Sequence, residues 1–240
     1  MAKSGNNRGR LIFGGSFNPI HVGHLRLAIE AFALMKNYCS QVDFVPTAFP
    51  PHKKNAGLLP FAFRAKLVRA ALSFGQNFYC NEIENSLPVP SYSEQTLKAL
   101  LKRLPDEKLF FLLGSHDFTL LPEWRNGLSL PTLCDLVIAP RKEMNFADFL
   151  ALCEKLWPQK IVAAGQSENL AASGAGKVWQ VSLKTGGRIF FLQIPFLDIS
   201  ATYIRKLWLL DENVDFLMPF DVLDLLEKNR SEVTGCWRSR

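Results

Sequence analysis

The chain has 240 residues, of which 48% are apolar and 21% are charged, and it contains no long polar or single-residue tract. This composition is typical of an ordinary globular protein and excludes a disordered or fibrous chain. The formal net charge of +6 comes from scattered lysines and arginines, so it suits an anionic ligand without indicating one by itself.

The five cysteines are odd in number, widely spaced and without any C-x-x-C pair. Neither a disulfide framework nor a zinc site is therefore expected, and we interpret them as buried thiols. No stretch approaches the roughly 20 apolar residues that a membrane span needs, and the apolar run behind the basic first residues is too short for a signal-peptide core. We expect a cytoplasmic protein without a membrane or nucleic-acid partner.

Short apolar runs alternate with amphipathic stretches along the first two thirds of the chain. Leu11–Phe13 is followed by two glycines and then by residues 22–36, which have apolar side chains at helical spacing. The same alternation predicts further strands over 42–45, 78–83, 109–113 and 134–139, and further helices over 61–74, 93–103, 118–124 and 145–157. Strands that alternate with helices are typical of βαβ units, so we predict a doubly wound α/β fold with a mostly parallel sheet.

The last third is less regular. Residues 166–177 are rich in Ala, Gly and Ser and indicate a loop, whereas strand-like segments over 178–183 and 188–194 flank a turn at 185–187. Two helices are predicted over 200–210 and 220–228. Because no repeat or linker is visible, we expect one domain over 10–230, between a flexible segment over 1–9 and a tail over 231–240.

A glycine turn follows the first predicted strand and leads into a helix that carries two histidines. The motif reads Gly14-Gly15-Ser16-Phe17-Asn18-Pro19-Ile20-His21-Val22-Gly23-His24. The first N–H groups of a helix lack internal partners and the helix dipole adds positive potential, so such a turn is an anion site. His21 and His24 stand three apart and would project from one side of the first helical turn. A metal pair is the alternative, but no cysteine or carboxylate ligand set lies nearby.

Further motifs follow in order up to residue 205 and resemble those of the bacterial nicotinate-nucleotide adenylyltransferases. This family is a branch of the cytidylyltransferase-like nucleotidyltransferase superfamily, which shares the H-x-G-H element. Pro46–Lys53 resembles the family's P-x-x-x-P-P-H-K loop, and Ser91–Leu97 is similar to its S-Y-T-x-x-T-L. Phe110–Trp124 resembles its strand, G-x-D and tryptophan segment, and Ile199–Arg205 its I-S-x-T-x-I-R.

The resemblance implies a Rossmann-like fold and transfer of the adenylyl group from ATP to nicotinic acid mononucleotide, with release of pyrophosphate, as a step of NAD biosynthesis. Such a reaction needs positioned cationic donors rather than a protein nucleophile. The residues that the resemblance makes catalytic are His21, His24, Lys53 and Arg205.

Other residues are implied to bind the two substrates. Ser200 and Thr202 would bind the β- and γ-phosphates at a helix start, where Ser200 is also expected to be a plain helix cap. Trp124 would stack on the pyridine ring and Asp117 would hold a ribose hydroxyl. The remaining implied substrate-binding residues are Gly14, Gly15, Ser16, Phe17, Gly23, Tyr92, Ser93, Thr96, Gly114 and Arg125.

The implied partners are ATP and a pyridine mononucleotide. We expect Mg²⁺ to arrive on the ATP phosphates, without a protein ligand, because the sequence shows no carboxylate cluster suited to caging a cation. The sequence makes no prediction of an oligomeric state.

The chain departs from the family pattern mainly where the mononucleotide would bind. Gly114-Ser115-His116-Asp117 has one residue more than G-x-D, so either Asp117 is displaced or the strand end bulges, and His116 would enter the pocket. Segment 143–187 is longer than usual. Three single positions also differ, namely Ser93 for threonine, Ala201 for serine, and Asn85 for an arginine after Glu84.

Several alternatives stay open at this point. The acceptor could be nicotinamide mononucleotide or another phosphate such as phosphopantetheine, although phosphopantetheine and cytidylyl enzymes lack the P-P-H-K and S-Y elements. Class I aminoacyl-tRNA synthetases also use H-x-G-H but need a lysine-rich second motif and an RNA-binding domain. A nucleotide-sensing module without catalysis would lose His24 or Arg205, and both are present.

Overall fold

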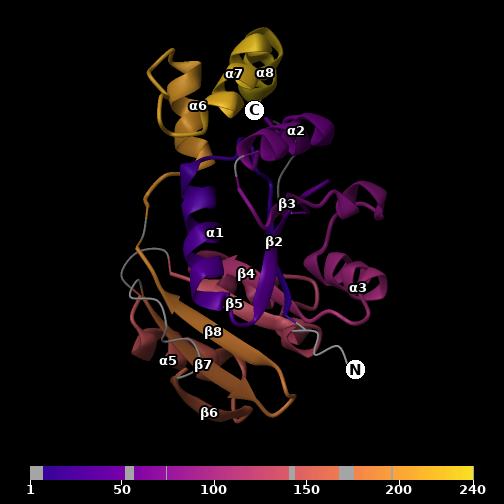
Figure 1. Cartoon of the computed structure of the whole chain (residues 1–240), viewed down its shortest axis with the longest axis vertical. Helices are drawn as coiled ribbons and strands as arrows, with labels where there is room; N and C mark the ends of the chain where they lie inside the picture. Colours follow the sequence, from indigo (N-terminus) through magenta and orange to yellow (C-terminus); the bar gives the residue numbers. More distant parts are fainter. Residues whose placement is uncertain are drawn as a thin grey trace, which may run out of the picture.

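The computed structural model describes residues 8–51, 57–73, 75–140, 144–167, 176–195 and 197–239, and its centre is a single sheet. The strands lie in the order β3-β2-β1-β4-β5-β8-β7-β6 (Figure 1). Their bounds are β1 (Gly9–Gly15), β2 (Cys39–Pro46), β3 (Phe78–Cys80), β4 (Leu109–Gly114), β5 (Asp135–Ala139), β6 (Ile161–Gln166), β7 (Lys177–Leu183) and β8 (Arg188–Gln193). Pairing is parallel from β3 to β8, whereas β7 pairs antiparallel with both β8 and β6.

Helices cover both faces of the sheet. They are α1 (Val22–Met35), α2 (Phe61–Ala71), α3 (Ser93–Arg103), α4 (Ser115–Thr119), α5 (Phe146–Leu156), α6 (Ala201–Leu209), α7 (Phe220–Lys228) and α8 (Arg230–Arg238). Short 3₁₀ turns are η1 (Ile83–Ser86), η2 (Leu121–Glu123) and η3 (Gly127–Thr132). Successive strand residues point to opposite faces, so Leu11 and Phe13 pack in the core with α1 and α2, whereas Ile12 packs with α3 and α5. This arrangement confirms the predicted doubly wound α/β fold.

Strand β1 is the place where the order of the sheet reverses. The chain runs from β1 outward to β2 and β3, then returns to β4 on the other side of β1 and continues to β5. In doubly wound sheets, ligands bind beyond the carboxyl ends of the strands at this reversal. The glycine turn after β1 lies at that point.

Several elements differ from the sequence-based expectation. The predicted helix over 118–124 is instead the short helix α4 and the 3₁₀ turn η2, and the predicted strand over 78–83 ends at Cys80. Strand β6 was not predicted, because its sequence does not alternate between apolar and polar residues. In the structure, residues 161–166 are half-buried or exposed. Helix α8 occupies most of the range that we expected to be a tail, and it buries Val233 and Trp237. Residues 168–175 of the expected loop lie outside the described part of the chain.

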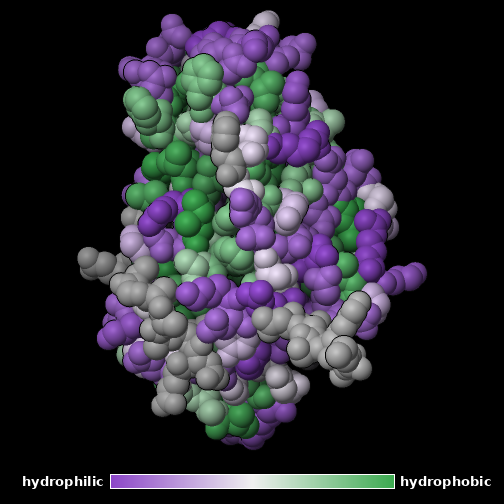
Figure 2. All heavy atoms as spheres, viewed as in Figure 1, coloured by the Kyte–Doolittle hydropathy of each residue, from purple (hydrophilic) through white to green (hydrophobic). Residues whose placement is uncertain are grey.

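The two ends of the molecule are built differently. In Figure 1 helices α6, α7 and α8 gather at one end, near α2 and one end of α1, and the antiparallel strands β6 to β8 form the opposite end. The face visible in Figure 2 is largely hydrophilic, with apolar atoms showing between the polar ones. In the described ranges, every helix is too short or too polar to cross a membrane.

All five cysteines are free thiols, as expected from their spacing. Cys39, Cys134 and Cys153 are buried, whereas Cys80 and Cys236 are half-buried. Burial raises the pKa of Cys80 to about 11 and that of Cys153 to about 12, so both thiols are protonated at neutral pH.

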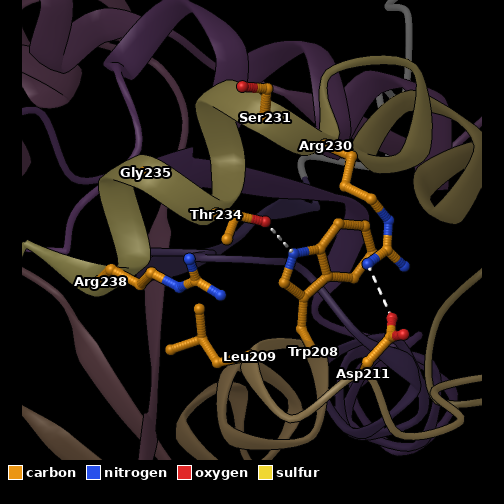
Figure 3. Close-up of a pocket in the computed structure, with 8 residues that line it drawn as sticks. All are labelled: Trp208, Leu209, Asp211, Arg230, Ser231, Thr234, Gly235 and Arg238. Carbon is orange, nitrogen blue, oxygen red and sulfur yellow. Dashed lines mark hydrogen bonds and ion pairs between the residues drawn. The ribbon is translucent and has the colours of Figure 1, made fainter.

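Helix α8 packs against α6 around a groove of about 510 Å³, shown in Figure 3. The Trp208 indole donates to the Thr234 hydroxyl at 3.0 Å, and the Arg230 guanidinium lies 4.3 Å from the centre of the Trp208 ring. Arg230 also pairs with Asp211 at 3.0 Å. These contacts join α8 to the domain, and the groove holds none of the motif residues predicted from the sequence.

Replacing Trp237 with alanine should therefore destabilise the whole domain. The indole is 1% exposed and lies edge-on to Trp208, so we expect Trp237→Ala to lower the free energy of unfolding by about 3–5 kcal/mol in urea denaturation. Ser231→Ala on the exposed side of the same helix should change it by less than about 0.5 kcal/mol. Equal effects of the two changes would mean that α8 is a loosely attached tail.

Candidate active site

The turn after β1 is built on a buried aromatic ring. Phe17 adopts a positive φ of 44° and is 1% exposed, and its ring lies against that of His24 with 5.1 Å between centroids. A side chain at Gly15 would come within 3.0 Å of the Phe17 ring. Phe17, predicted to bind substrate, is thus placed beneath the turn, where its side chain supports His24, while Gly14 is exposed and Gly15 and Ser16 are half-buried.

The two motif histidines lie face to face at the start of α1. His21 is the residue that precedes the helix, and His24 is in its first turn. Their ring centroids are 3.7 Å apart, with 35° between the ring planes. The two rings lie together, as expected from their spacing, but the helix starts at Val22, so His21 precedes the first turn instead of standing in it. A single phosphate group could contact both rings.

Glycine at residue 23 allows α1 to meet the beginning of α6. A Cβ atom there would lie 3.0 Å from the His21 ring and 3.2 Å from the Ile199 carbonyl oxygen. One of the first N–H groups of α1 is not available to an anion, because Val22 donates to the Leu217 carbonyl at 2.9 Å. The Val22–Leu217 hydrogen bond could not be predicted from the sequence, because the two residues are far apart along the chain.

The start of α6 carries the second predicted phosphate contact. The Ser200 hydroxyl accepts from the Tyr203 N–H at 3.1 Å, so Ser200 is the helix cap that the sequence predicted. Arg205 donates to the Asn18 carbonyl at 2.8 Å and to the Thr202 hydroxyl at 3.0 Å. Arg205 and Thr202 are thereby held beside the turn that carries the histidines.

Asn18 is a residue of this site to which the sequence analysis gave no role. Its side-chain amide donates to the Gly57 carbonyl at 2.6 Å and its amide oxygen accepts from the Leu59 N–H at 3.2 Å. The Trp237 indole also faces that oxygen, at 3.4 Å. Its place inside the motif was visible in the sequence, but the residues that it joins could be found only from the fold.

A second group of predicted residues lies at the start of α3. Tyr92 precedes the helix and Ser93 is its first residue. The Arg125 guanidinium lies 4.9 Å from the centre of the Tyr92 ring, so the structure brings these two predicted residues together. Thr96, also predicted to bind substrate, is 5% exposed, and its hydroxyl donates to Glu84 at 2.8 Å.

The extra residue before Asp117 lies in the segment after β4. Strand β4 stays in regular register with β5 up to Gly114, so the strand end does not bulge. Asp117 instead lies in the short helix α4, where both it and His116 are exposed. Trp124 is half-buried and packs against the core on the α3 side of the sheet.

Lys53 lies outside the described residues. Elsewhere in the chain, the ranges that the structure describes contain no group of three or more His, Cys, Asp or Glu side chains that could hold a metal ion. The described site thus offers histidine rings, one guanidinium and helix N-termini, which suit a polyphosphate.

Comparisons with known proteins show the family of the chain. Residues 12–207 match the family model described as Cytidylyltransferase-like, so the chain belongs to the cytidylyltransferase-like family. Within it, the chain is similar to nicotinate-nucleotide adenylyltransferases.

One relative is a probable nicotinate-nucleotide adenylyltransferase of Geobacter sulfurreducens, 32% identical over 91% of this chain and 95% of its own. Another, of Syntrophotalea carbinolica, bears the same name and is 32% identical over 88% of this chain and 91% of its own. The Plasmodium falciparum nicotinic acid mononucleotide adenylyltransferase, solved in complex with NaAD, shares the fold with a TM-score of 0.64 at 16% identity, covering 93% of this chain and 96% of that one.

A methyl group at residue 23 should separate the two helix starts. We expect Gly23→Ala to lower the free energy of unfolding by about 1–3 kcal/mol, because the His21 ring and the Ile199 backbone must both move. The matched control is Gly235→Ala in α8, where a Cβ atom meets nothing within 4 Å and the change should stabilise by about 0.5–1 kcal/mol. Urea denaturation of both variants checks the prediction, which fails if Gly23→Ala is neutral or stabilising.

Proposed function

We propose that this chain transfers the adenylyl group of ATP to nicotinic acid mononucleotide, giving nicotinic acid adenine dinucleotide and pyrophosphate. A phosphate oxygen of the mononucleotide forms a bond to the α-phosphorus of ATP, and the bond from that phosphorus to the α,β-bridging oxygen breaks. The observation that carries the proposal is the pair of adjacent rings of His21 and His24, with Arg205 fixed to the same turn through the Asn18 carbonyl.

The chain would act by positioning the phosphates and by neutralising charge on the departing pyrophosphate. His21 and His24 would contact the α-phosphate and the bridging oxygen. Thr202, the start of α6 and Arg205 would bind the β- and γ-phosphates, because Arg205 already points toward the turn. Lys53 would add a further cation to the phosphates.

Mg²⁺ would enter with ATP and keep most of its water, and it would supply further charge neutralisation on the phosphates. The donor set of the described site contains nitrogen donors rather than a carboxylate cage, so we assign no protein ligand to the ion.

The acceptor would bind between α3 and the segment that follows β4. The ring of Tyr92 and the guanidinium of Arg125 already lie together there. We propose that Trp124 stacks on the pyridine ring, that Ser93 and Arg125 bind its carboxylate, and that Asp117 accepts from a ribose hydroxyl. Nicotinamide mononucleotide is the second candidate acceptor, since it differs only in carrying a carboxamide in place of that carboxylate.

Incubation of the purified chain with ATP, Mg²⁺ and either mononucleotide tests the proposal. We expect dinucleotide and pyrophosphate in equal amounts, and faster turnover with nicotinic acid mononucleotide than with its amide. If neither acceptor gives product, the proposed function is wrong. A preference for the amide would overturn only the choice of acceptor.

The role of His24 can be separated from folding. We expect His24→Ala to lower kcat by a factor of about 100 or more, because a donor to the phosphates is lost, and to change the melting temperature little. Ile29→Ala, an exposed position on the same helix, is the control and should leave kcat unchanged. A His24→Ala protein that unfolds easily yet keeps normal kcat would show that the ring serves packing alone.

A further inference from the structure

Arg64 is a buried cation without a role in the chemistry proposed above. It lies on α2 and its side chain is 0% exposed. Each of its three side-chain nitrogens donates to a different backbone carbonyl, namely Leu59 at 2.8 Å, Ser16 at 2.8 Å and Ala48 at 3.3 Å. The planar fork of a guanidinium is suited to holding three groups at once.

The three carbonyls belong to two parts of the chain that the proposed reaction uses. Ser16 is part of the turn between β1 and the two histidines. Ala48 and Leu59 stand at the two ends of the segment 48–59, which follows β2 and contains Lys53 in its sequence. One side chain therefore holds both ends of this segment and the phosphate turn together.

Neighbouring contacts hold the same two ends. At the first end, the Ala48 N–H donates to Glu84 at 2.8 Å, and Glu84 also accepts from the Thr96 hydroxyl. At the second end, Asn18 of the turn accepts from the Leu59 N–H. Ala48 is thus fixed through its N–H by a buried carboxylate and through its carbonyl by a buried guanidinium.

A charge in this position is costly, so its retention calls for an explanation. Burial lowers the pKa of Arg64 to about 10, and the charge of Glu84 opposes that shift. An apolar side chain would avoid the desolvation cost of the charge. It would, however, leave three carbonyls without this donor and would release both ends of the segment.

We propose that Arg64 is a positioning residue for adenylyl transfer, which fixes the ends of segment 48–59 against the phosphate turn. This inference rests on the proposed function. The Arg64 side chain is buried and its three nitrogens donate to backbone carbonyls, so it acts through the Ser16 turn and through the segment that carries Lys53. Loss of the fork disturbs the alignment of groups in the transition state more than it disturbs binding.

The test compares Arg64→Lys with Arg10→Lys. A lysine keeps the charge but cannot hold three carbonyls. Arg10 is the matched control because it also makes several bonds, to Glu107 at 2.7 Å and to Asp43 at 3.4 Å, but lies toward the opposite end of β1 from the site. Both variants are assayed well below their melting temperatures, and trypsin cleavage after Lys53 and Lys54 is followed in parallel.

For Arg64→Lys we expect kcat to fall about tenfold or more, KM for both substrates to change less than about threefold, and cleavage to become faster. Arg10→Lys should lose stability only. Normal kcat and normal cleavage in Arg64→Lys overturn the inference. If the wild-type chain makes no product, the proposed function fails, and the cleavage rates still decide whether Arg64 holds the segment. If Arg64→Lys does not fold, Arg64→Gln is assayed in its place, because it introduces no buried charge. Its kcat, KM and cleavage rate are compared with those of Arg10→Lys in the same way.

Discussion

The close approach of the Ile199 carbonyl to the start of α1 is the contact on which the site depends. It is possible because residue 23 has no side chain, and it brings the starts of α1 and α6 to the carboxyl end of β1. The two helices come from opposite ends of the chain, yet Arg205 reaches the Asn18 carbonyl directly. The N-termini of α1 and α6 and the Arg205 guanidinium therefore lie at one strand end, so the fold concentrates positive potential where the order of the sheet reverses.

Around this contact, several hydrogen bonds from guanidinium and backbone N–H groups are accepted by backbone carbonyls. Arg205 and Arg64 donate to the carbonyls of Asn18 and Ser16, and Leu217 takes the Val22 N–H. A turn held by backbone carbonyls in this way does not depend on these contacts having a carboxylate partner. Glu84, a buried carboxylate among the described residues nearby, binds Ala48 and Thr96.

Much of the fold and the members of the site could be predicted from the sequence, because alternating strands and amphipathic helices are local patterns. The histidine pair could be placed for the same reason, since the two residues stand only three positions apart at the start of one helix. Strand β6 escaped prediction because an edge strand needs no buried face. The engagement of the Thr96 hydroxyl by Glu84, the burial of Phe17 and the three bonds of Arg64 depend on contacts between distant segments, which no local pattern encodes. The extra residue before Asp117 was visible, but only the register of β4 with β5 showed that it lies in α4.

The span of chain that these contacts bridge has a consequence for biosynthesis. The bond from Arg205 to Asn18 joins residues 187 positions apart, and that from Trp237 to Asn18 joins residues 219 apart. A ribosome releases the glycine turn well before Arg205 and Trp237, so the strands around β1 can pair before their turn receives these partners. A nascent chain that is cut short before α6 would therefore hold its two histidines without the guanidinium that binds their turn.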